Sequence, residues 1–193
     1  MAYIQTISET DATGDLAAIY SSITRNRGKI AEVHSIQSLN PPTIPAHMEL
    51  YRTVMFARSP VSRAEREMMA VVVSVVNECA YCIAHHRAAL LHFWKDSAKC
   101  DRLETAARTG EFDGPELALT SREMRLCRFA RRVTAKPAAG HDGSAVAELE
   151  LSDREALDAT LVVGYFNFVN RIVLTLGVEI ESDPGGYRYD GET

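Results

Sequence analysis

The apolar residues of the chain recur at helical spacings, in segments that capping residues, glycines and prolines separate. Residues 16–39 carry apolar side chains three and four positions apart, with an interruption at Gly28 and an Asn-Pro-Pro stop signal at 40–42. Residues 44–56 repeat the pattern and end shortly before the next proline. The N-terminal part of the chain therefore predicts helices joined by short turns.

The segment that follows is the most apolar part of the chain. Ser62 followed by Glu65 is a capping box, in which each side chain bonds the backbone N–H of the other residue, so a helix should begin there. Every residue from 68 to 76 except Ser74 is apolar, which is typical of a helix surrounded by protein on all sides. A buried strand would also suit the valines. We favour a helix, because of the capping box and because no turn signal interrupts the segment.

Further helices are expected downstream, each marked by a capping residue, a glycine or a proline. They are a helix over 79–94, one from Thr120 or Ser121 to Pro137, a short one after the loop 138–144, and one from Ser152 to Gly177. No stretch alternates with a period of two residues, so no sheet is expected. The sequence therefore predicts one all-α, multi-helix domain over 1–193, with a loosely ordered tail at 182–193.

The overall composition is that of an ordinary soluble globular protein. The chain has 193 residues, of which 46% are hydrophobic and 24% charged, and its mean hydropathy is −0.12. A net charge of −5 provides no basic patch for nucleic acid or for an anionic membrane surface. The N-terminus lacks the pattern of a signal peptide, and the apolar run at 68–76 is about half as long as a membrane span. We therefore expect a cytoplasmic protein that binds neither nucleic acid nor membrane.

Residues 77–86, NECAYCIAHH, hold two of the four cysteines and two of the six histidines. In a reducing cytosol a C-x-x-C pair is more often metal-binding or catalytic than structural. Zinc needs four ligands in a tetrahedron, which one short helical segment cannot easily supply, and the sequence has no second C-x-x-C. Both cysteines could instead be inert core residues, as we expect for Cys100 and Cys127. The pairing favours redox chemistry, because this spacing permits a disulfide and can lower the pKa of one thiol.

Helix geometry separates the two neighbouring histidines. At about 100° per residue, with Cys79 at zero, Cys82 lies near −60° and His86 near −20°, between the two sulfurs, whereas His85 lies near −120°. Cys82 and His86 also form an i,i+4 pair on adjacent turns. His86 is therefore the candidate base beside the thiols. His85 is expected to pack, or to form a hydrogen bond, at the edge of the group.

Other polar residues lie in segments that otherwise predict protein core. Glu67 is either a solvated carboxylate in the first turn of its helix or a partly buried group that exchanges protons with an imidazole, and position alone favours the first. Asn167 and Asn170 fall in the last helix, where a structural or subunit-interface role is expected rather than a contact with substrate. His47 receives the same interpretation, and His34 belongs to no recognisable constellation.

The pattern E-x(11)-C-x-Y-C-x(3)-H, formed by Glu67, Cys79, Tyr81, Cys82 and His86, resembles the AhpD-like alkylhydroperoxidase family of the carboxymuconolactone decarboxylase superfamily. The segments NPPTIPAHMELYRTVMF, SRAERE and GYFNFVNRIVLTLGVEIE resemble its peroxidase-related subgroup, so the similarity extends from about residue 40 to 181. The resemblance implies an all-helical fold that assembles into homo-oligomers, as a dimer, trimer or hexamer.

The resemblance also implies a thiol peroxidase that uses no cofactor. By position, Cys82 would attack the peroxide and become a sulfenic acid, and Cys79 would resolve it as a disulfide. His86 and Glu67 would form the proton relay, which reverses the solvated interpretation of the carboxylate. An external dithiol reductant, either a protein or a small thiol, would then restore the two thiols.

One position departs from the family pattern. The best-known AhpD proteins carry a histidine immediately before the second cysteine, where this chain has Tyr81, a poor base near neutral pH. Tyr81, His85, Asn167 and Asn170 are therefore only possible supporting residues. Two alternatives remain: a redox-responsive regulatory protein that uses the same disulfide without turnover, and an enzyme like the decarboxylase branch. That branch lacks the cysteine pair, so decarboxylation is disfavoured.

Overall fold

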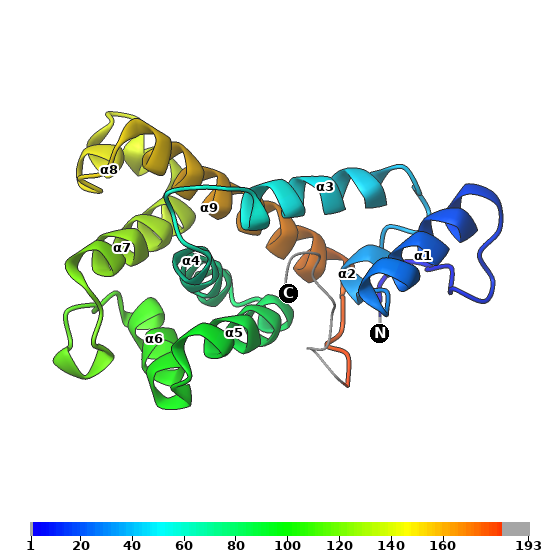
Figure 1. Ribbon diagram of the computed structural model, residues 1–193, viewed down its shortest axis with the longest axis horizontal. Helices are drawn as coiled ribbons and strands as arrows, with labels where there is room; N and C mark the ends of the chain where they lie inside the picture. Colours follow the sequence, from blue (N-terminus) through cyan, green and yellow to red (C-terminus); the bar gives the residue numbers. More distant parts are fainter. Residues whose placement is uncertain (1, 183–193) are drawn as a thin grey trace.

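The computed structural model describes residues 2–182, and these fold into helices joined by short turns, with no β-strand among them (Figure 1). In chain order the elements are α1 (Gly14–Arg27), α2 (Glu32–Ser35), α3 (Thr43–Phe56), α4 (Arg63–Val76), α5 (Ala80–Trp94), α6 (Ser97–Thr109), the 3-10 helix η1 (Pro115–Leu117), α7 (Ser121–Ala135), the 3-10 helix η2 (Pro137–Gly140), α8 (Ser144–Ala147) and α9 (Asp153–Leu176). The all-α prediction is confirmed. The tail predicted to be loosely ordered lies, apart from Ser182, outside the described residues.

Helix α4 is the centre of the bundle, and Figure 1 shows it nearly end-on with α5, α6, α7 and α9 around it. The predicted capping box is present: Ser62 Oγ accepts the Glu65 N–H at 3.2 Å, and Glu65 accepts the Ser62 N–H at 2.7 Å. Every side chain from Met68 to Val75, Ser74 included, is at most 2% exposed. The prediction of a helix enclosed on all sides is confirmed, because neighbouring helices cover every face of α4.

The N-terminal helices differ from the prediction in length. Helix α1 ends at Gly28, whose φ of +85° lies in the left-handed region that glycine adopts without strain. The predicted interruption at Gly28 is present, but beyond it the chain forms only the short α2 before α3, instead of helix up to residue 39. Leu16 and Tyr20 of α1 pack with Ile44 of α3 in a small cluster of their own. Helix α1 thus lies at one end of the molecule, next to the start of α3 (Figure 1).

Helix α6 was not predicted, although its caps are visible in the sequence. Asp96 is the N-cap and accepts the Lys99 N–H at 2.9 Å, while Gly110 ends the helix with a φ of +89°. Only a narrow stripe of small and apolar residues faces the core, so the apolar periodicity between these caps is weak. The capping residues, and not the apolar pattern, were the signal for this element.

Helix α9 is the longest helix and brings the C-terminal part of the chain to the site. By length and hydropathy this helix could cross a membrane. However, 44% of its most apolar segment is buried inside the bundle, and the core helix of a globular protein has the same length and hydropathy. It packs against α3, α4 and α7. After Gly177 the chain turns back, and Glu181 then contacts both α2 and α5. The polypeptide after α9 therefore takes part in the environment of the C-x-x-C segment.

The main core contains several sulfur-bearing side chains. Met55 of α3 and Met68 and Met69 of α4 have no exposed surface. Cys100 and Cys127 are also buried, in agreement with the small buried residues expected there. Burial raises the pKa of both thiols, most strongly that of Cys127. Neither thiol is therefore suited to act as a nucleophile.

Candidate active site

A tight turn between α4 and α5 positions both cysteines of the C-x-x-C pair. Glu78 adopts a left-handed φ of +57°, and the Cys79 N–H donates to the Ser74 carbonyl at 2.9 Å, which reverses the chain. Cys79 is the N-cap of α5, and Cys82 lies in its first turn. Both thiols are free and buried, with 0% and 2% of their surface exposed. The Cys79 sulfur thus sits at a helix N-terminus, where the backbone favours negative charge.

The two thiols differ in their preference for the negative charge. The pKa of Cys79 is lowered, because the hydrogen bond from the Cys82 side chain, helped by the Cys82 backbone N–H, outweighs burial. The pKa of Cys82 is raised well above its usual value by the same pairing with Cys79 and by burial, and a contact with Asn170 only partly opposes this. When the pair loses its first proton, the charge therefore settles on Cys79 and the remaining proton stays on Cys82.

A buried carboxylate orients His86. Glu67 has no exposed surface; its Oε1 accepts hydrogen bonds from Arg63 Nε at 2.9 Å and Nη2 at 2.5 Å, and its Oε2 lies 2.7 Å from His86 Nδ1. Burial raises the pKa of Glu67, but His86 and Arg63 together outweigh burial, so the pKa is lowered and the carboxylate is ionised. An ionised carboxylate only accepts, so His86 Nδ1 carries a hydrogen and Nε2 is the atom that can exchange a proton.

Tyr81 and His85 share a second carboxylate. The Tyr81 hydroxyl donates to Glu181 Oε1 at 2.8 Å and accepts the Val33 N–H at 3.3 Å, while Glu181 Oε2 lies 2.8 Å from His85 Nε2. Burial raises the pKa of Glu181, but the hydrogen bonds from His85, from the Glu32 backbone N–H and from Tyr81 lower it to about 2. Tyr81 is therefore held in place by hydrogen bonds to Glu181 and to the Val33 backbone, and it shares the Glu181 carboxylate with His85. The bond expected for His85 is present, with a partner 96 residues away.

An amide cluster joins α4 and α9 next to Cys82. Asn77 Nδ2 donates to Asn167 Oδ1 at 3.1 Å and to Asn170 Oδ1 at 2.9 Å. Asn170 Nδ2 in turn donates to Ser74 Oγ at 3.4 Å, and the Asn170 side chain also hydrogen-bonds Cys82. Asn167 thus has the structural role that the sequence suggested, whereas Asn170 also contacts a thiol.

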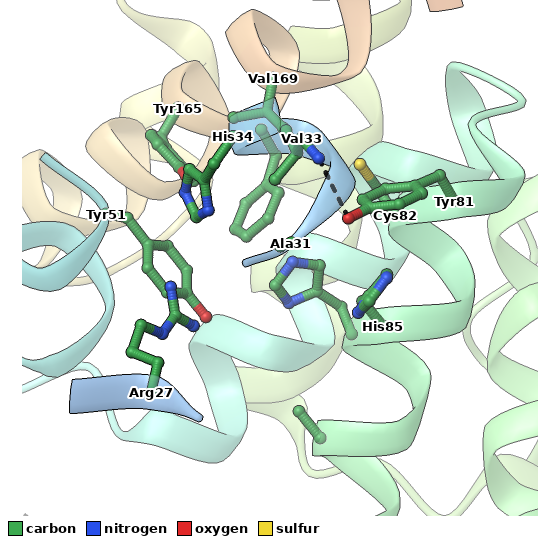
Figure 2. A pocket seen from close by; sticks show the side chains of 13 residues that line it. Arg27, Ala31, Val33, His34, Tyr51, Tyr81, Cys82, His85, Tyr165 and Val169 are labelled. Atoms are coloured by element: carbon green, nitrogen blue, oxygen red, sulfur yellow. Dashed lines mark hydrogen bonds between the residues drawn. The ribbon is translucent and has the colours of Figure 1, made fainter. Parts of the chain in front are cut away.

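A pocket that opens to solvent lies beside Cys82, with about 550 Å³ of empty space in and in front of it. Figure 2 shows Tyr81, Cys82 and His85 of α5 on one side and His34, Tyr51 and Tyr165 on the other. His86 and Phe166 also line it, and their rings meet edge to face with centroids 4.4 Å apart. Of the two thiols, Cys82 lines the pocket, so a small molecule that enters meets Cys82 and His86 together.

A metal centre finds no support in the part of the chain that the structure describes. Within residues 2–182 no three His, Cys, Asp or Glu side chains gather in a way that could hold an ion. The zinc alternative considered for the C-x-x-C segment therefore lacks a ligand set there.

Comparison with known proteins agrees with this geometry. Residues 42–124, which include α3, α4, the cysteine turn and α5, match the model of the carboxymuconolactone decarboxylase family. None of the curated proteins matches the sequence.

Solved structures extend the likeness over nearly the whole chain. A peroxidase-related protein from Silicibacter sp. TM1040 is 25% identical, with a TM-score of 0.72 over 92% of both chains. An AhpD-core protein from Ralstonia eutropha JMP134, also described as peroxidase-related, is 20% identical, with a TM-score of 0.75 over 95% of this chain and 94% of that one. The debrominase Bmp8 is 18% identical, with a TM-score of 0.72 over 94% of both chains. The chain therefore has the AhpD-core fold.

Residues that the sequence singled out converge at the pocket, together with others that it did not. The structure gathers around the pocket Glu67, Cys79, Tyr81, Cys82, His85, His86 and Asn170. Arg63, Glu181 and Tyr165 also lie at this site, although no sequence pattern singled them out. Arg63 was detectable, because it precedes Glu67 by one helical turn. Glu181 and Tyr165 approach the site only through the tertiary fold, and no local pattern marks them.

Proposed function

We propose that this protein is a thiol peroxidase that reduces hydroperoxides through a dithiol–disulfide cycle of Cys79 and Cys82. The observation that carries the proposal is that Cys82 and His86 line one pocket, while Arg63 and Glu67 fix the orientation of His86. Cys79 lies within hydrogen-bonding reach of Cys82, as a disulfide partner must. The likeness to peroxidase-related structures supports the same chemistry.

The proposed cycle balances with the groups that the site contains. The Cys82 thiolate attacks one oxygen of the hydroperoxide ROOH, the O–O bond breaks, and the leaving alkoxide takes a proton to become the alcohol ROH. Cys79 then attacks the Cys82 sulfenic acid, which forms the disulfide and releases water. Two thiols are oxidised, one peroxide is reduced, and an external dithiol restores the pair by exchange.

Proton placement gives Cys79 a part in the first step. Cys82 faces the pocket but holds the shared proton, whereas Cys79 holds the charge. We assign the attack to Cys82, because only this thiol is in contact with the space that a substrate enters. The Cys82 proton can pass to the Cys79 sulfur, to which it is already hydrogen-bonded. From there it can reach the alkoxide through His86 Nε2, which carries no hydrogen of its own and so can accept this proton and pass it on.

A thiol titration tests the proposal. Reduced protein is treated with one equivalent of cumene hydroperoxide, and the free thiols are counted while mass spectrometry locates any new bond. The expected result is the loss of two thiols with a Cys79–Cys82 disulfide, and continuous peroxide consumption when dithiothreitol is present. Full turnover by the Cys82→Ser variant would refute the assignment of the attacking thiol.

Two alternatives give different results in the same experiment. A redox-responsive regulatory protein would form the disulfide once, without sustained turnover in dithiothreitol. A debromination activity is suggested by the aromatic pocket and by the structure of a Bmp8 cysteine-to-alanine variant that holds 2,3,4-tribromopyrrole. In that case the bromopyrrole, and not the hydroperoxide, would oxidise the two thiols. Bromide would be released, and a hydrogen would take its place on the pyrrole.

We further propose that the protein works as a homo-oligomer in the cytoplasm.

A further inference from the structure

One side of α9 is apolar although it faces solvent. This outer face consists of residues that lie within one sector about 100° wide on the helix: Leu157, Thr160, Leu161, Gly164 and Phe168. Leu157, Leu161 and Phe168 are 55, 46 and 46% exposed, and no charged residue lies between positions 158 and 171. The outer face explains why α9 is apolar enough to cross a membrane although less than half of its most apolar segment is buried. An exposed apolar strip of this kind indicates a surface that another molecule covers.

Helix α3 widens this surface. The two helices run side by side (Figure 1), and the His47 ring of α3 meets the Phe168 ring with centroids 5.6 Å apart. Leu50, one turn after His47, is 44% exposed, so the apolar surface continues from α9 onto α3. Because His47 also bonds Tyr165 in the wall of the pocket, this surface lies behind that wall.

Gly164, in the middle of the outer face, is not required by the packing of the single chain. A glycine inside a helix is about 1 kcal/mol less favourable than alanine. A Cβ atom at Gly164 would meet no atom within 4 Å, and the backbone there does not have a left-handed φ. Thr160, one turn earlier, turns its hydroxyl back to the Ala156 carbonyl, to which it donates at 2.7 Å. Both positions keep the surface low, which lets the backbone of another helix come close.

Two opposite charges lie at the ends of the outer face. Asp153 and Arg171 are 18 positions apart, so they lie on one line along α9, about 27 Å from each other. Within the described residues Arg171 uses only Nη1, for bonds to the Asn167 carbonyl oxygen and Oδ1 at 2.7 and 2.9 Å. Neither charge forms a salt bridge within residues 2–182. Each end of the face therefore carries a charge that the single chain does not pair.

A second copy of α9, packed antiparallel on the first, matches this pattern. If Asp153 of one copy faces Arg171 of the other, two-fold symmetry repeats the same pair at the opposite end. Thr160 and Gly164 lie equally far from the midpoint of this contact, so each faces the other where the helices cross. The two helix dipoles also run in opposite directions, which is favourable. A membrane would explain the apolar side chains, but neither the matched charges nor the missing side chain of Gly164.

We propose that the outer face of α9 is the interface between two copies of this chain, which pack with their α9 helices antiparallel. Asp153 of each copy pairs with Arg171 of the other, the apolar side chains fill the space between these pairs, and Gly164 lets the helices approach. This interface defines a contact of the homo-oligomer proposed above, and it does not depend on the peroxidase chemistry. A two-fold contact also requires an even number of chains in the complete assembly.

Sedimentation velocity of the full chain tests this interface. The wild-type protein is compared with Asp153→Arg, with Arg171→Asp, with the double variant that exchanges both charges, and with Gly164→Leu. Glu111→Arg is the matched control, because Glu111 is an exposed acidic residue in the turn after α6 and forms no salt bridge among the described residues. Circular dichroism verifies that each variant keeps its helices.

Wild type and the control are expected to sediment at twice the chain mass of 21.3 kDa, or at another even multiple of it. Each single charge reversal should raise the dissociation constant of this contact about tenfold, because symmetry replaces two ion pairs by two repulsions. The double variant should return to the wild-type constant, because opposite charges face each other again. Gly164→Leu should dissociate without loss of helix, since its side chain blocks the close approach but has free space in the single chain.

Three results would overturn the proposal: an odd number of chains in the wild-type assembly, a dissociation constant that none of the variants changes, or a double variant as weak as the single ones. A monomeric wild type that floats with phosphatidylcholine vesicles would assign the outer face to a membrane instead. The peroxidase proposal is tested separately, by thiol loss with cumene hydroperoxide, so the two proposals can fail independently.

Discussion

Substitution of Glu67 by Gln removes the buried charge that orients His86 while keeping the shape of the side chain. The carboxylate accepts two hydrogen bonds from Arg63 and one from His86, and it has no exposed surface. Glutamine keeps one acceptor oxygen, which the two Arg63 bonds retain. Its amide nitrogen then faces His86 Nδ1 as a donor, so the ring hydrogen must move to Nε2. His86 then offers a hydrogen, and no free electron pair, to the pocket.

The magnitudes follow from the bonds that change. Each Arg63 bond becomes weaker by about 1 kcal/mol when its acceptor loses the charge, and the His86 bond is reversed, so the free energy of unfolding should fall by about 3 kcal/mol. This is at the low end of the range for breaking a buried pair, because the Arg63 side chain is 20% exposed and water can solvate it. The rate of thiol oxidation should fall by about 10² to 10⁴, since a positioned base in the correct tautomer contributes that much.

Quenched-flow alkylation with mass spectrometry measures this rate for the reduced protein and cumene hydroperoxide at pH 7. Urea unfolding followed by circular dichroism measures the stability. Glu104→Gln is the matched control, because Glu104 is also mostly buried and ion-paired, with Arg87 at 3.0 Å, but it lies on α6 outside the pocket. Its oxidation rate should stay within about twofold of wild type. If the folded Glu67→Gln protein oxidised as fast as the control, His86 would not act through this carboxylate.

Three further predictions concern the thiols, the second carboxylate and metal. In Cys79→Ala the pKa of Cys82 should fall, because the pairing with Cys79 that raises it is lost; thiolate absorbance at 240 nm measures this, and a rise would contradict the charge assignment. Glu181→Gln should be less stable than wild type at pH 7. The pKa of Glu181 in the folded protein is about 2, against a usual value of 4.5, so the difference in the free energy of unfolding between the two proteins should narrow as the pH falls from 4.5 towards 2. Urea titrations measure this difference, and a difference that widened would contradict the account. Addition of EDTA should leave the melting temperature unchanged, whereas a drop of several degrees would indicate that a bound metal stabilises the fold.

Sequence patterns predicted the central part of the fold because local signals and burial agree there. In α4 the capping box decided between helix and strand, and the apolar run at 68–76 correctly indicated a helix enclosed by others. This inference succeeded because it depends on residues within one or two helical turns. Helix periodicity also placed His86, and not His85, on the side of the two thiols, which stays a prediction; the contact of His86 with Glu67 joins two helices and was implied only by the family resemblance.

The remaining parts of the site depend on contacts between distant segments. His85 and Tyr81 meet Glu181 only because the chain turns back after α9, and no spacing rule connects positions 96 residues apart. His47 looked like an isolated histidine, yet it bonds Tyr165 from a helix 118 positions later in the chain. Position alone also misplaced Glu67 in solvent, since α4 is buried from Arg66 onward and Glu67 has no exposed surface. Tertiary packing, which these patterns do not encode, set all three environments.

The buried methionines affect how long such an enzyme would resist oxidative inactivation. A protein that handles hydroperoxides is itself exposed to them, and oxidation converts an apolar thioether into a polar sulfoxide. Met55, Met68 and Met69 have no exposed surface, so oxidant reaches them only when the bundle opens. Resistance to oxidative inactivation should therefore follow folding stability. A substitution that loosens α4 would shorten the working life of the protein even where the thiols, His86 and the pocket were left intact.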